Sequence, residues 1–313
     1  MKRASPDLFF MRGVFFIVGP TATGKSEIAA DVASEIDAEV ISADAFQIYR
    51  GLDLLTAKPD AATLAKAPHH LIRAMSILEE MNAAKFRRLA LEAIAEIQSR
   101  GKLTIVIGGS GLYVKALTHG LSAGPGSDPK TRAKLSKLSI DQLRRRLVDL
   151  DPESARKIDM KNRQRVIRAL EICLLSGRPA SAQRTDWAGN VPAHGVFVFR
   201  DRDDLYERIN RRVEAMFDGG VIEEVRAAGA MSETASKMIG LREIRQLLDG
   251  KMSILQCVAA IQQATRRYAK RQLTWFRRQT NFQSLNLSLL SRNEAVKEIS
   301  QLAKSFGVAQ GND

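Results

Sequence analysis

A glycine-rich stretch that ends in lysine and serine is the most specific chemical signal in this sequence. It reads GPTATGKS and comprises Gly19, Pro20, Thr21, Ala22, Thr23, Gly24, Lys25 and Ser26. With this spacing, backbone N–H groups surround an anion, the lysine contacts phosphate oxygens and the serine hydroxyl holds Mg²⁺. An apolar run precedes the stretch and a helical pattern follows it, as a phosphate-binding loop requires. It predicts a site for a diphosphate or longer phosphate chain and leaves the rest of the ligand open.

Asp44 is the next residue able to take part in chemistry, because it directly follows the apolar run 39–43. Nucleotide hydrolases with this loop carry a metal-binding acid near the end of a neighbouring strand, whereas the apolar run 103–109 ends in glycines. The carboxyl ends of parallel strands line the ligand crevice, so Asp44, Thr21 and Ser110 are expected to face one cleft. Asp44 is also placed to cap the N-terminus of a helix over the following AFQIY, and the two roles can coexist.

The elements that must position these residues are those of a parallel sheet. Apolar and β-branched runs at 13–18, 39–43 and 103–109 predict buried strands. Helical periodicity begins at Glu27 and recurs over 85–101. Continuous apolar strands that alternate with helices belong to a sheet covered on both faces. We therefore predict an α/β fold with a doubly wound parallel P-loop core.

A helical segment interrupts this core. Ser139 and Gln142 form a capping box at the start of one of its helices, and Gly177 ends its last helix. A strand-like run at 194–199 then resumes the sheet. We expect the first part of the core at 1–123, a helical insertion domain at 124–187, and the second part of the core, with a basic C-terminal helix, at 188–313.

The charge of the chain is strongly positive and uneven. Lys and Arg outnumber Asp and Glu by 48 to 35, a net charge of +13. The segment 124–187 alone holds 15 of these cations against 8 acids. Such a surface attracts polyanions, and nucleic acid is the commonest polyanion of a cytoplasm. The alternative is a basic protein whose charge serves only solubility, and composition does not decide between the two.

The cysteine and histidine content argues against a metal centre and an oxidising compartment. Cys173 and Cys257 lie far apart without a CxxC pattern. His69 and His70 are adjacent, so their side chains point apart and a structural role is favoured. No apolar run reaches the ~20 residues that span a bilayer, and charges break the apolar N-terminal region. We expect a cytoplasmic protein that engages no membrane.

Several segments, taken in order, resemble the tRNA dimethylallyltransferase family. They are GPTATGKS, ISADAFQIYRGLDLLTAKP, PHHLI, GGSGLYVKAL and KRQLTWFRR, and the resemblance runs from about Gly13 to Arg278. It implies transfer of the dimethylallyl group from dimethylallyl diphosphate to the exocyclic amine of the adenosine 3′ of a tRNA anticodon, with Mg²⁺ as the cofactor. The implied partner is the anticodon stem-loop of tRNA. The resemblance is to the bacterial type, because the zinc finger of eukaryotic members is absent from the sequence. We expect the protein to be a monomer.

The resemblance also assigns roles to single residues. Asp44 matches the family's general base, which accepts the proton of the amine as the new bond forms. Thr21 and Lys25, with the loop amides and Mg²⁺ at Ser26, stabilise the departing diphosphate. Arg242 in KMIGLR matches the family's catalytic arginine. Four positions depart from the usual family residues: Ala45 in place of Ser, Ser110 in place of Thr, Leu241 in place of Tyr and Arg73 in place of Asp.

Further segments match family segments that contact tRNA, although a solvated basic face is the alternative for each. Helical spacing in ATRRYAKRQLTWFRR aligns Arg267, Arg271 and Arg278 in one row. The implied tRNA contacts are Asp44, Ala45, Phe46, Gln47, Ser110, Arg132, Gln164, Arg165, Val166, Ile167, Arg168, Lys237, Met238, Ile239, Gly240, Leu241, Arg242, Lys270, Arg271, Gln272, Leu273, Thr274, Trp275, Phe276 and Arg277.

Two other classes of protein also contain a phosphate-binding loop of this kind. A P-loop kinase for a nucleotide or small metabolite would use the helical insertion as a lid. A non-enzymatic RNA-binding protein would use a nucleoside triphosphate as a switch. The missing strand-end acid and the basic KRQLTWFRR helix weigh against the kinase. Asp44 together with Thr21 and Arg242 weighs against a pure binder.

Overall fold

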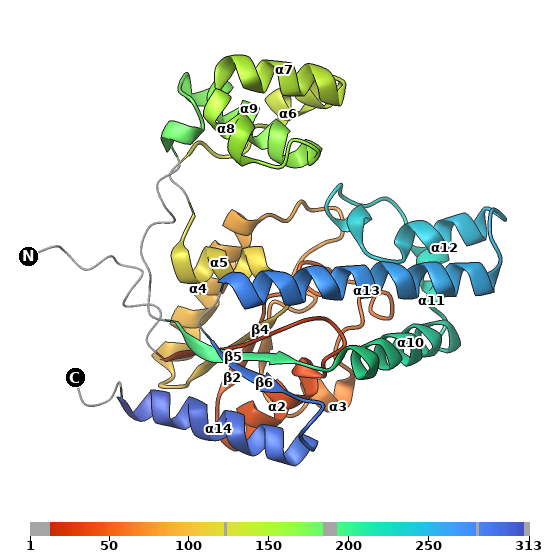
Figure 1. Ribbon diagram of the computed structural model, residues 1–313. Coiled ribbons are helices and arrows are strands. Elements are labelled where there is room, and N and C mark those ends of the chain that lie inside the picture. Colours follow the sequence, from red (N-terminus) through yellow and green to blue (C-terminus); the bar gives the residue numbers. More distant parts are fainter. Residues whose placement is uncertain (1–12, 122–123, 184–192, 280–281, 310–313) are drawn as a thin grey trace, which may run out of the picture. The chain divides into compact units, whose positions relative to one another are not determined.

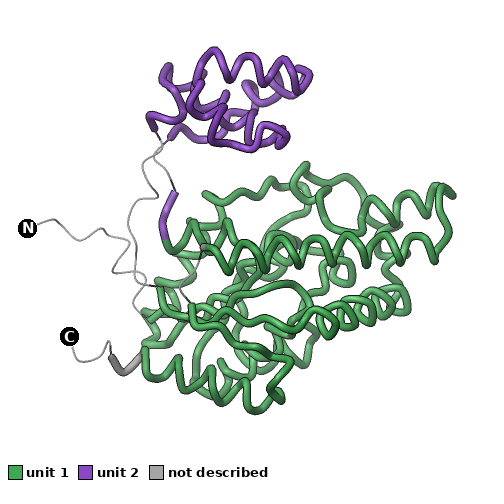
Figure 2. The backbone as a smooth tube through the Cα atoms, viewed as in Figure 1, with its two compact units in different colours: residues 1–118, 191–313 green, residues 119–190 purple. Residues whose placement is uncertain are grey.

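Two units make up the chain in this computed structural model. The structure describes residues 13–121, 124–183, 193–279 and 282–309. The first unit comprises residues 1–118 and 191–313, and the second comprises residues 119–190 (Figure 2). The boundaries of the second unit lie a few residues outside the 124–187 expected from composition.

Among the described residues, six parallel strands form the sheet of the first unit (Figure 1). The strands are β1 (Val14–Val18), β2 (Glu39–Ser42), β3 (His69–His70), β4 (Thr104–Gly108), β5 (His194–Phe199) and β6 (Gln283–Asn286). Their order is β3-β2-β4-β1-β5-β6. β1 therefore lies between β4 and β5, with Val14 opposite Thr104 and Phe15 opposite His194. The chain segments on either side of the second unit thus pair within one sheet.

Helices cover both faces of this sheet. They are α2 (Lys25–Glu35), α3 (Ala61–Leu64), α4 (Ala83–Ser99), α5 (Gly111–His119), α10 (Arg202–Asp218), α11 (Val221–Ala227), α12 (Leu241–Leu248), α13 (Ile254–Gln279) and α14 (Arg292–Ala309), with a 3₁₀ turn η2 (Ala235–Lys237). Alternate side chains of β1 point to opposite faces. Phe15 and Ile17 pack in a cluster with α2 and α14, whereas Phe16 packs in a cluster with α4 and α13. The predicted doubly wound α/β core is confirmed.

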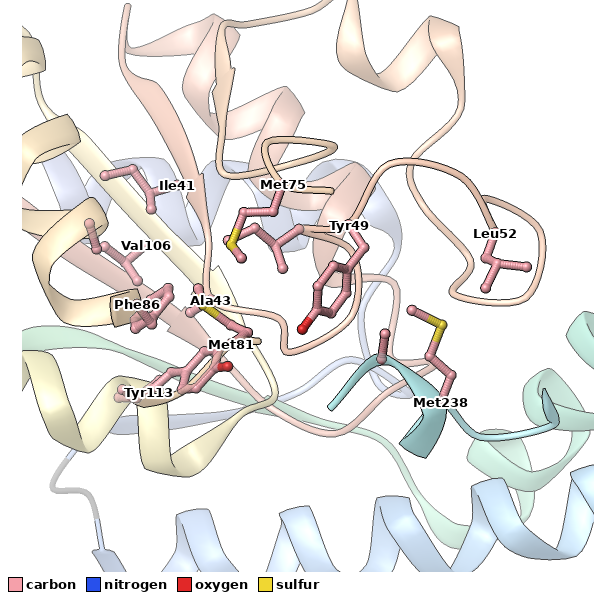
Figure 3. Packing of buried hydrophobic residues seen from close by; sticks show 14 of the residues in the cluster. Ile41, Ala43, Tyr49, Leu52, Met75, Met81, Phe86, Val106, Tyr113 and Met238 are labelled. Carbon is pink, nitrogen blue, oxygen red and sulfur yellow. The ribbon is translucent and has the colours of Figure 1, made fainter. Parts of the chain in front are cut away.

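Buried aromatic and methionine side chains hold the loop after β2 against the sheet (Figure 3). Tyr49 of this loop is fully buried, and its hydroxyl lies 2.8 Å from Oγ1 of Thr234, just before η2. The rings of Phe86 and Tyr113 stack nearby with their centroids 4.2 Å apart. This packing fixes the chain at the carboxyl ends of the strands, where a ligand site of a parallel sheet is expected.

The second unit is helical and has a core of its own. Its elements are α6 (Pro129–Ser136), α7 (Ile140–Leu150), α8 (Pro152–Lys157), α9 (Arg163–Ser176) and the 3₁₀ turn η1 (Ser181–Gln183). The predicted capping box is present, since Ser139 Oγ accepts from the Gln142 N–H and Gln142 Oε1 accepts from the Ser139 N–H. Gly177 ends α9 in the left-handed region, with φ 66°. In the described part of either unit, no helix is both long and apolar enough to cross a membrane.

Candidate functional site

The glycine-rich stretch connects β1 to α2 and forms an anion nest. Ala22 and Gly24 have left-handed backbones, with φ 64° and 93°. The carbonyl of Pro20 is bound by the Thr23 hydroxyl at 3.0 Å and by the Lys25 ammonium. Within the described ranges, the backbone N–H groups of residues 22–26 have no hydrogen-bond partner. They are therefore available to a bound phosphate.

Two arginines from the chain beyond the second unit hold the loop from outside. Arg200, which follows β5, donates from Nε to the carbonyl of Thr23 at 2.9 Å. Arg208 of α10 donates from Nε to the carbonyl of Ala22 at 2.9 Å. Both arginines bind carbonyl oxygens of the loop. The N–H groups on the opposite side of the loop are therefore left to face a bound anion.

Two desolvated cations face one carboxylate beside the loop. Arg212 of α10 donates from Nη1 to Oγ1 of Thr21 at 3.1 Å. Burial lowers the pKa of Lys25 to about 7; the carboxylate of Asp44 opposes this shift and the charge of Arg212 adds to it. Burial also lowers the pKa of Arg212, again against the opposing effect of Asp44. A site with this excess of buried positive charge favours a polyvalent anion.

Asp44 lies just after β2 with one of its oxygens committed. Oδ1 accepts from the backbone N–H groups of Phe46 and Gln47 at 2.8 and 3.1 Å. Oδ2 has no hydrogen bond to any residue that the structure describes. Asp44 therefore caps a turn, where the sequence suggested a helix, and its second oxygen is available for proton transfer.

A cavity of about 680 Å³ brings these groups together. Its polar lining includes Thr21, Lys25, Ser26, Asp44, Arg208 and Arg212. Its apolar lining includes Leu55, Val213, Met216, Met238 and Ile261. Thr21 and Asp44 thus share one cleft, as the sequence predicts. Ser110 is not part of the lining.

The loop after Asp44 has a strained backbone that other elements hold in place. Leu52 and Ala57 have φ 52° and 45°, a region that residues other than glycine rarely adopt. The carboxylate of Glu224 in α11 accepts from the N–H groups of Leu54 and Leu55, both at 2.9 Å. Strain of this kind persists where the surrounding structure over-determines it, and it clusters at ligand sites.

The same loop contains a buried lysine. The side chain of Lys58 is 1% exposed and lies 2.7 Å from Oδ1 of Asp53. Arg73 binds the other oxygen of Asp53 at 2.6 Å. Arg73, a departure from the family pattern, therefore supports the loop that lines the cavity.

Arg242, the expected catalytic arginine, does not line the cavity. Its side chain is 78% exposed and pairs with the neighbouring Glu243 at 2.7 Å. The cavity instead receives Arg208 and Arg212, which sequence reasoning missed. Their i, i+4 spacing in α10 puts them on one face of the helix. In the sequence, this spacing alone could have suggested that the two arginines line the same site.

The expected tRNA contacts divide by exposure. Gln164, Arg165, Lys237, Arg242, Lys270, Arg271, Thr274 and Arg277 are exposed. Ala45, Phe46, Gln47, Ser110, Ile239, Leu273 and Trp275 are half-buried. Val166, Ile167, Met238, Gly240, Leu241, Gln272 and Phe276 are buried. Of the last group, Met238 and Gln272 line the cavity, so they can meet only a base that enters it, and contact with the RNA backbone falls to exposed residues.

Two of the expected phosphate ligands in the second unit are already paired with a buried acid. The side chain of Glu171 is fully buried and lies 2.9 Å from Arg132 and 2.6 Å from Arg168. It also accepts from the N–H of Asp128 at 2.7 Å. The bonds from Arg132 and Asp128 fasten α6 and the residue before it to α9. Arg165, one turn before Arg168, stays exposed and is the freer candidate for a phosphate.

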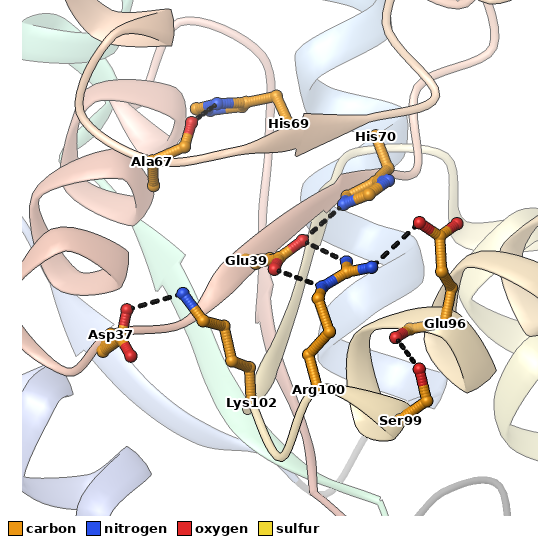
Figure 4. A network of polar contacts seen from close by, with 9 residues as sticks. All are labelled: Asp37, Glu39, Ala67, His69, His70, Glu96, Ser99, Arg100 and Lys102. Atoms are coloured by element: carbon orange, nitrogen blue, oxygen red, sulfur yellow. Dashed lines mark hydrogen bonds and ion pairs between the residues drawn. The ribbon is translucent and has the colours of Figure 1, made fainter.

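The adjacent histidines belong to polar contacts at the sheet edge (Figure 4). His70 lies 2.8 Å from Glu39, which Arg100 also binds. The ring of His69 lies 2.7 Å from the carbonyl of Ala67. Within the part of the chain that the structure describes, no cluster of His, Cys, Asp and Glu side chains is arranged to hold a metal ion.

Known proteins are similar to this chain in both sequence and fold. A protein-family model described as IPP transferase matches residues 47–279. The tRNA dimethylallyltransferase 1 of Citrifermentans bemidjiense is 45% identical over 84% of this chain and 88% of its own length. The tRNA dimethylallyltransferase of Akkermansia muciniphila is 40% identical over 90% of this chain and 96% of its own.

A solved structure extends the likeness over both units. The crystal structure of a tRNA isopentenylpyrophosphate transferase from Bacillus halodurans matches with a TM-score of 0.69 and 34% identity. The match covers 96% of this chain and 98% of the other. With the family model spanning more than half of the sequence, these relatives show that the chain belongs to the IPP transferase family.

Proposed function

We propose that this protein transfers the dimethylallyl group of dimethylallyl diphosphate to the exocyclic amine of the adenosine 3′ of the anticodon in tRNA. The observation that carries the proposal is one cavity in which an anion nest and two desolvated cations lie beside a carboxylate with a free oxygen. The names of the relatives, tRNA dimethylallyltransferases, support the same reaction.

The polar end of the cavity suits the diphosphate. The free N–H groups of residues 22–26, the ammonium of Lys25 and the guanidinium of Arg212 all lie where they can bind its oxygens. The apolar end, with Leu55 and Met238 among its lining, suits a short hydrocarbon. Arg212, rather than the exposed Arg242, is therefore our candidate for the arginine that stabilises the departing charge.

The reaction is a direct displacement. The adenine nitrogen attacks the first carbon of the dimethylallyl group, the bond from that carbon to the diphosphate oxygen breaks, and diphosphate leaves with the electron pair. Asp44 accepts the amine proton on Oδ2 while Oδ1 remains bound to Phe46 and Gln47. Thr21, whose hydroxyl oxygen accepts from Arg212, keeps its own proton to donate to the departing oxygen.

The residues present fit Mg²⁺ bound together with the diphosphate. The Ser26 hydroxyl lines the cavity and has no hydrogen bond to a residue within the described ranges. Ser26 would hold the ion with diphosphate oxygens and waters, because Mg²⁺ takes few protein ligands of this kind. When bound, the ion neutralises charge on the leaving group.

The exposed cations of α13 are our candidates for the anticodon stem-loop. Lys270, Arg271 and Arg277 are exposed on this helix, whose buried side borders the cavity. An anticodon-loop base is unpaired, so its extraction into a pocket costs little. We propose that the protein acts as a monomer, because one chain can supply the anion nest, the carboxylate and the apolar lining of the cavity. The free cysteines Cys173 and Cys257 support a reducing cytoplasm as the compartment.

The test is to incubate the protein with dimethylallyl diphosphate, Mg²⁺ and bulk tRNA, and to analyse the digested nucleosides by mass. We expect prenylated adenosine in the tRNA, and its absence would refute the proposal. A parallel reaction with ATP and small-molecule acceptors tests the kinase alternative, for which we expect no phosphorylated product.

A further inference from the structure

One buried amide connects the RNA-facing helix to the phosphate-binding loop. Gln272 of α13 is 6% exposed, although the family resemblance places it among the tRNA contacts. Its Oε1 accepts from the backbone N–H of Thr21 at 2.9 Å. Its Nε2 donates to the carbonyl of Gly109, at the end of β4, also at 2.9 Å. One acceptor and one donor of a single amide thus join two loops of the cleft to α13.

The sequence at the end of β4 leaves room for this approach. A Cβ at Gly109 would lie 2.2 Å from Nε2 of Gln272. A Cβ at Gly111 would lie 2.4 Å from the ring of Trp275, one turn further along α13. The glycines that end this strand in place of an acid therefore let α13 lie against the site.

We propose that Gln272 is a positioning residue, which fixes Thr21 for the departing diphosphate through an amide whose two ends are both bound to backbone groups. The N–H of Thr21 is held by α13 through Gln272, and its hydroxyl oxygen is held by α10 through Arg212. Two helices thus set the backbone and the side chain of Thr21 independently. Neither bond uses the proton of the Thr21 hydroxyl, so this residue of the cavity lining can donate it to a bound anion.

The inference rests on the proposed function for its meaning in catalysis, but one measurement is independent of that function. Gln272→Met keeps the length of the side chain and removes both hydrogen bonds. Gln272→Glu keeps an acceptor for the Thr21 N–H and loses the donor to Gly109. Gln263→Met, at an exposed position of the same helix, is the matched control. Thermal melting establishes that each variant is folded.

Loss of a buried hydrogen bond that leaves its partner unsatisfied changes an equilibrium by roughly 5- to 100-fold. We expect Gln272→Met to lower turnover at saturating tRNA and the affinity for inorganic pyrophosphate within this range. The Kd for tRNA, measured without diphosphate, should stay within about twofold, as for the control. Gln272→Glu should also lower the pyrophosphate affinity, because it loses the donor to Gly109 and adds a negative charge beside the anion nest.

Two results would overturn the inference. In the first, the Kd for tRNA rises as much as turnover falls, which would make Gln272 an RNA contact. In the second, a folded Gln272→Met, or Gln272→Glu if the former does not fold, matches Gln263→Met in pyrophosphate affinity. Pyrophosphate binding separates the two proposals, because it tests the position of Thr21 even if the wild-type protein transfers no prenyl group.

Discussion

Replacing Arg212 with glutamine tests the electrostatics of the cradle, by which we mean the anion nest of residues 22–26 together with Lys25 and Arg212. The test has two separate readouts. The first readout is turnover, because Arg212 reaches Thr21 and carries a desolvated charge beside the departing diphosphate. Removing one such donor lowers turnover by about 10²- to 10³-fold in comparable sites. A transfer assay at saturating tRNA and dimethylallyl diphosphate measures this loss.

The second readout is the charge of Lys25. Its pKa is lowered to about 7, chiefly by burial and further by the charge of Arg212. At a pH below this pKa, Lys25 of the ligand-free protein is already an ammonium ion, which is the form that binds a diphosphate. At a pH above this pKa, Lys25 must take up a proton when the diphosphate binds. The affinity of the wild-type protein for diphosphate should therefore fall as the pH rises, by about tenfold per unit above that pKa. Arg212→Gln removes a like charge, so the decline should begin at a higher pH.

Calorimetric titration with inorganic pyrophosphate, from about pH 6 to 9, measures this decline. Pyrophosphate itself ionises in the same pH range, so a reference is needed. In the Lys25→Met variant, the change of pyrophosphate affinity with pH reflects the ionisation of the ligand without that of the lysine. The ratio of each protein to Lys25→Met isolates the contribution of Lys25. If Arg212→Gln and the wild-type protein lose affinity over the same pH range, then Arg212 does not depress the pKa of Lys25, and our account of the cradle is wrong.

Three other substitutions address the base, the second unit and the RNA surface. Asp44→Asn keeps the acceptor for the Phe46 N–H, so we expect unchanged tRNA affinity and turnover reduced by ~10²–10⁴ in the transfer assay; equal losses in both would make Asp44 a cap only. Glu171→Gln removes the charge that Arg132 and Arg168 bind, so it should destabilise the second unit. The loss should be limited to about 1–3 kcal/mol, because the two arginines are only partly buried; an unchanged calorimetric melt would contradict this. Arg271→Ala should flatten the salt dependence of tRNA affinity by about 0.7–0.9 in slope, and an unaltered slope would remove Arg271 from the RNA contacts.

Features encoded by local pattern were predictable from the sequence. The phosphate-binding loop, the strands at 13–18 and 103–109, and the capping box at Ser139 each depend on neighbours within a few residues. β6 gave no such signal, because its sequence QSLN buries one apolar side chain at the edge of the sheet. β3 has two residues, and both are half-buried histidines. Short edge strands carry too little apolar pattern to stand out.

The contacts of the site that sequence reasoning missed join residues far apart along the chain: Arg212 was not predicted at all, and Gln272 was expected only as a tRNA contact. Arg212 meets Thr21 across 191 residues, and Gln272 meets it across 251. Each belongs to a helix rich in polar and charged side chains, so nothing in its own segment distinguishes a cradle residue from a solvated one. Only the packing of α10 and α13 against the loop makes the distinction.

The strand order explains how such distant residues meet at one place. β5, the first strand after the second unit, pairs with β1, the strand that leads into the phosphate-binding loop. Arg200 follows β5 and binds the carbonyl of Thr23, so the register of this pair places the start of α10 beside the loop. α10 then carries Arg208 and Arg212 along the cavity, and α13 packs on α10 and brings Gln272 to the other side of Thr21. The nest is thus encoded by residues 19–26, but its cations and its fixed geometry depend on the pairing of β1 with β5.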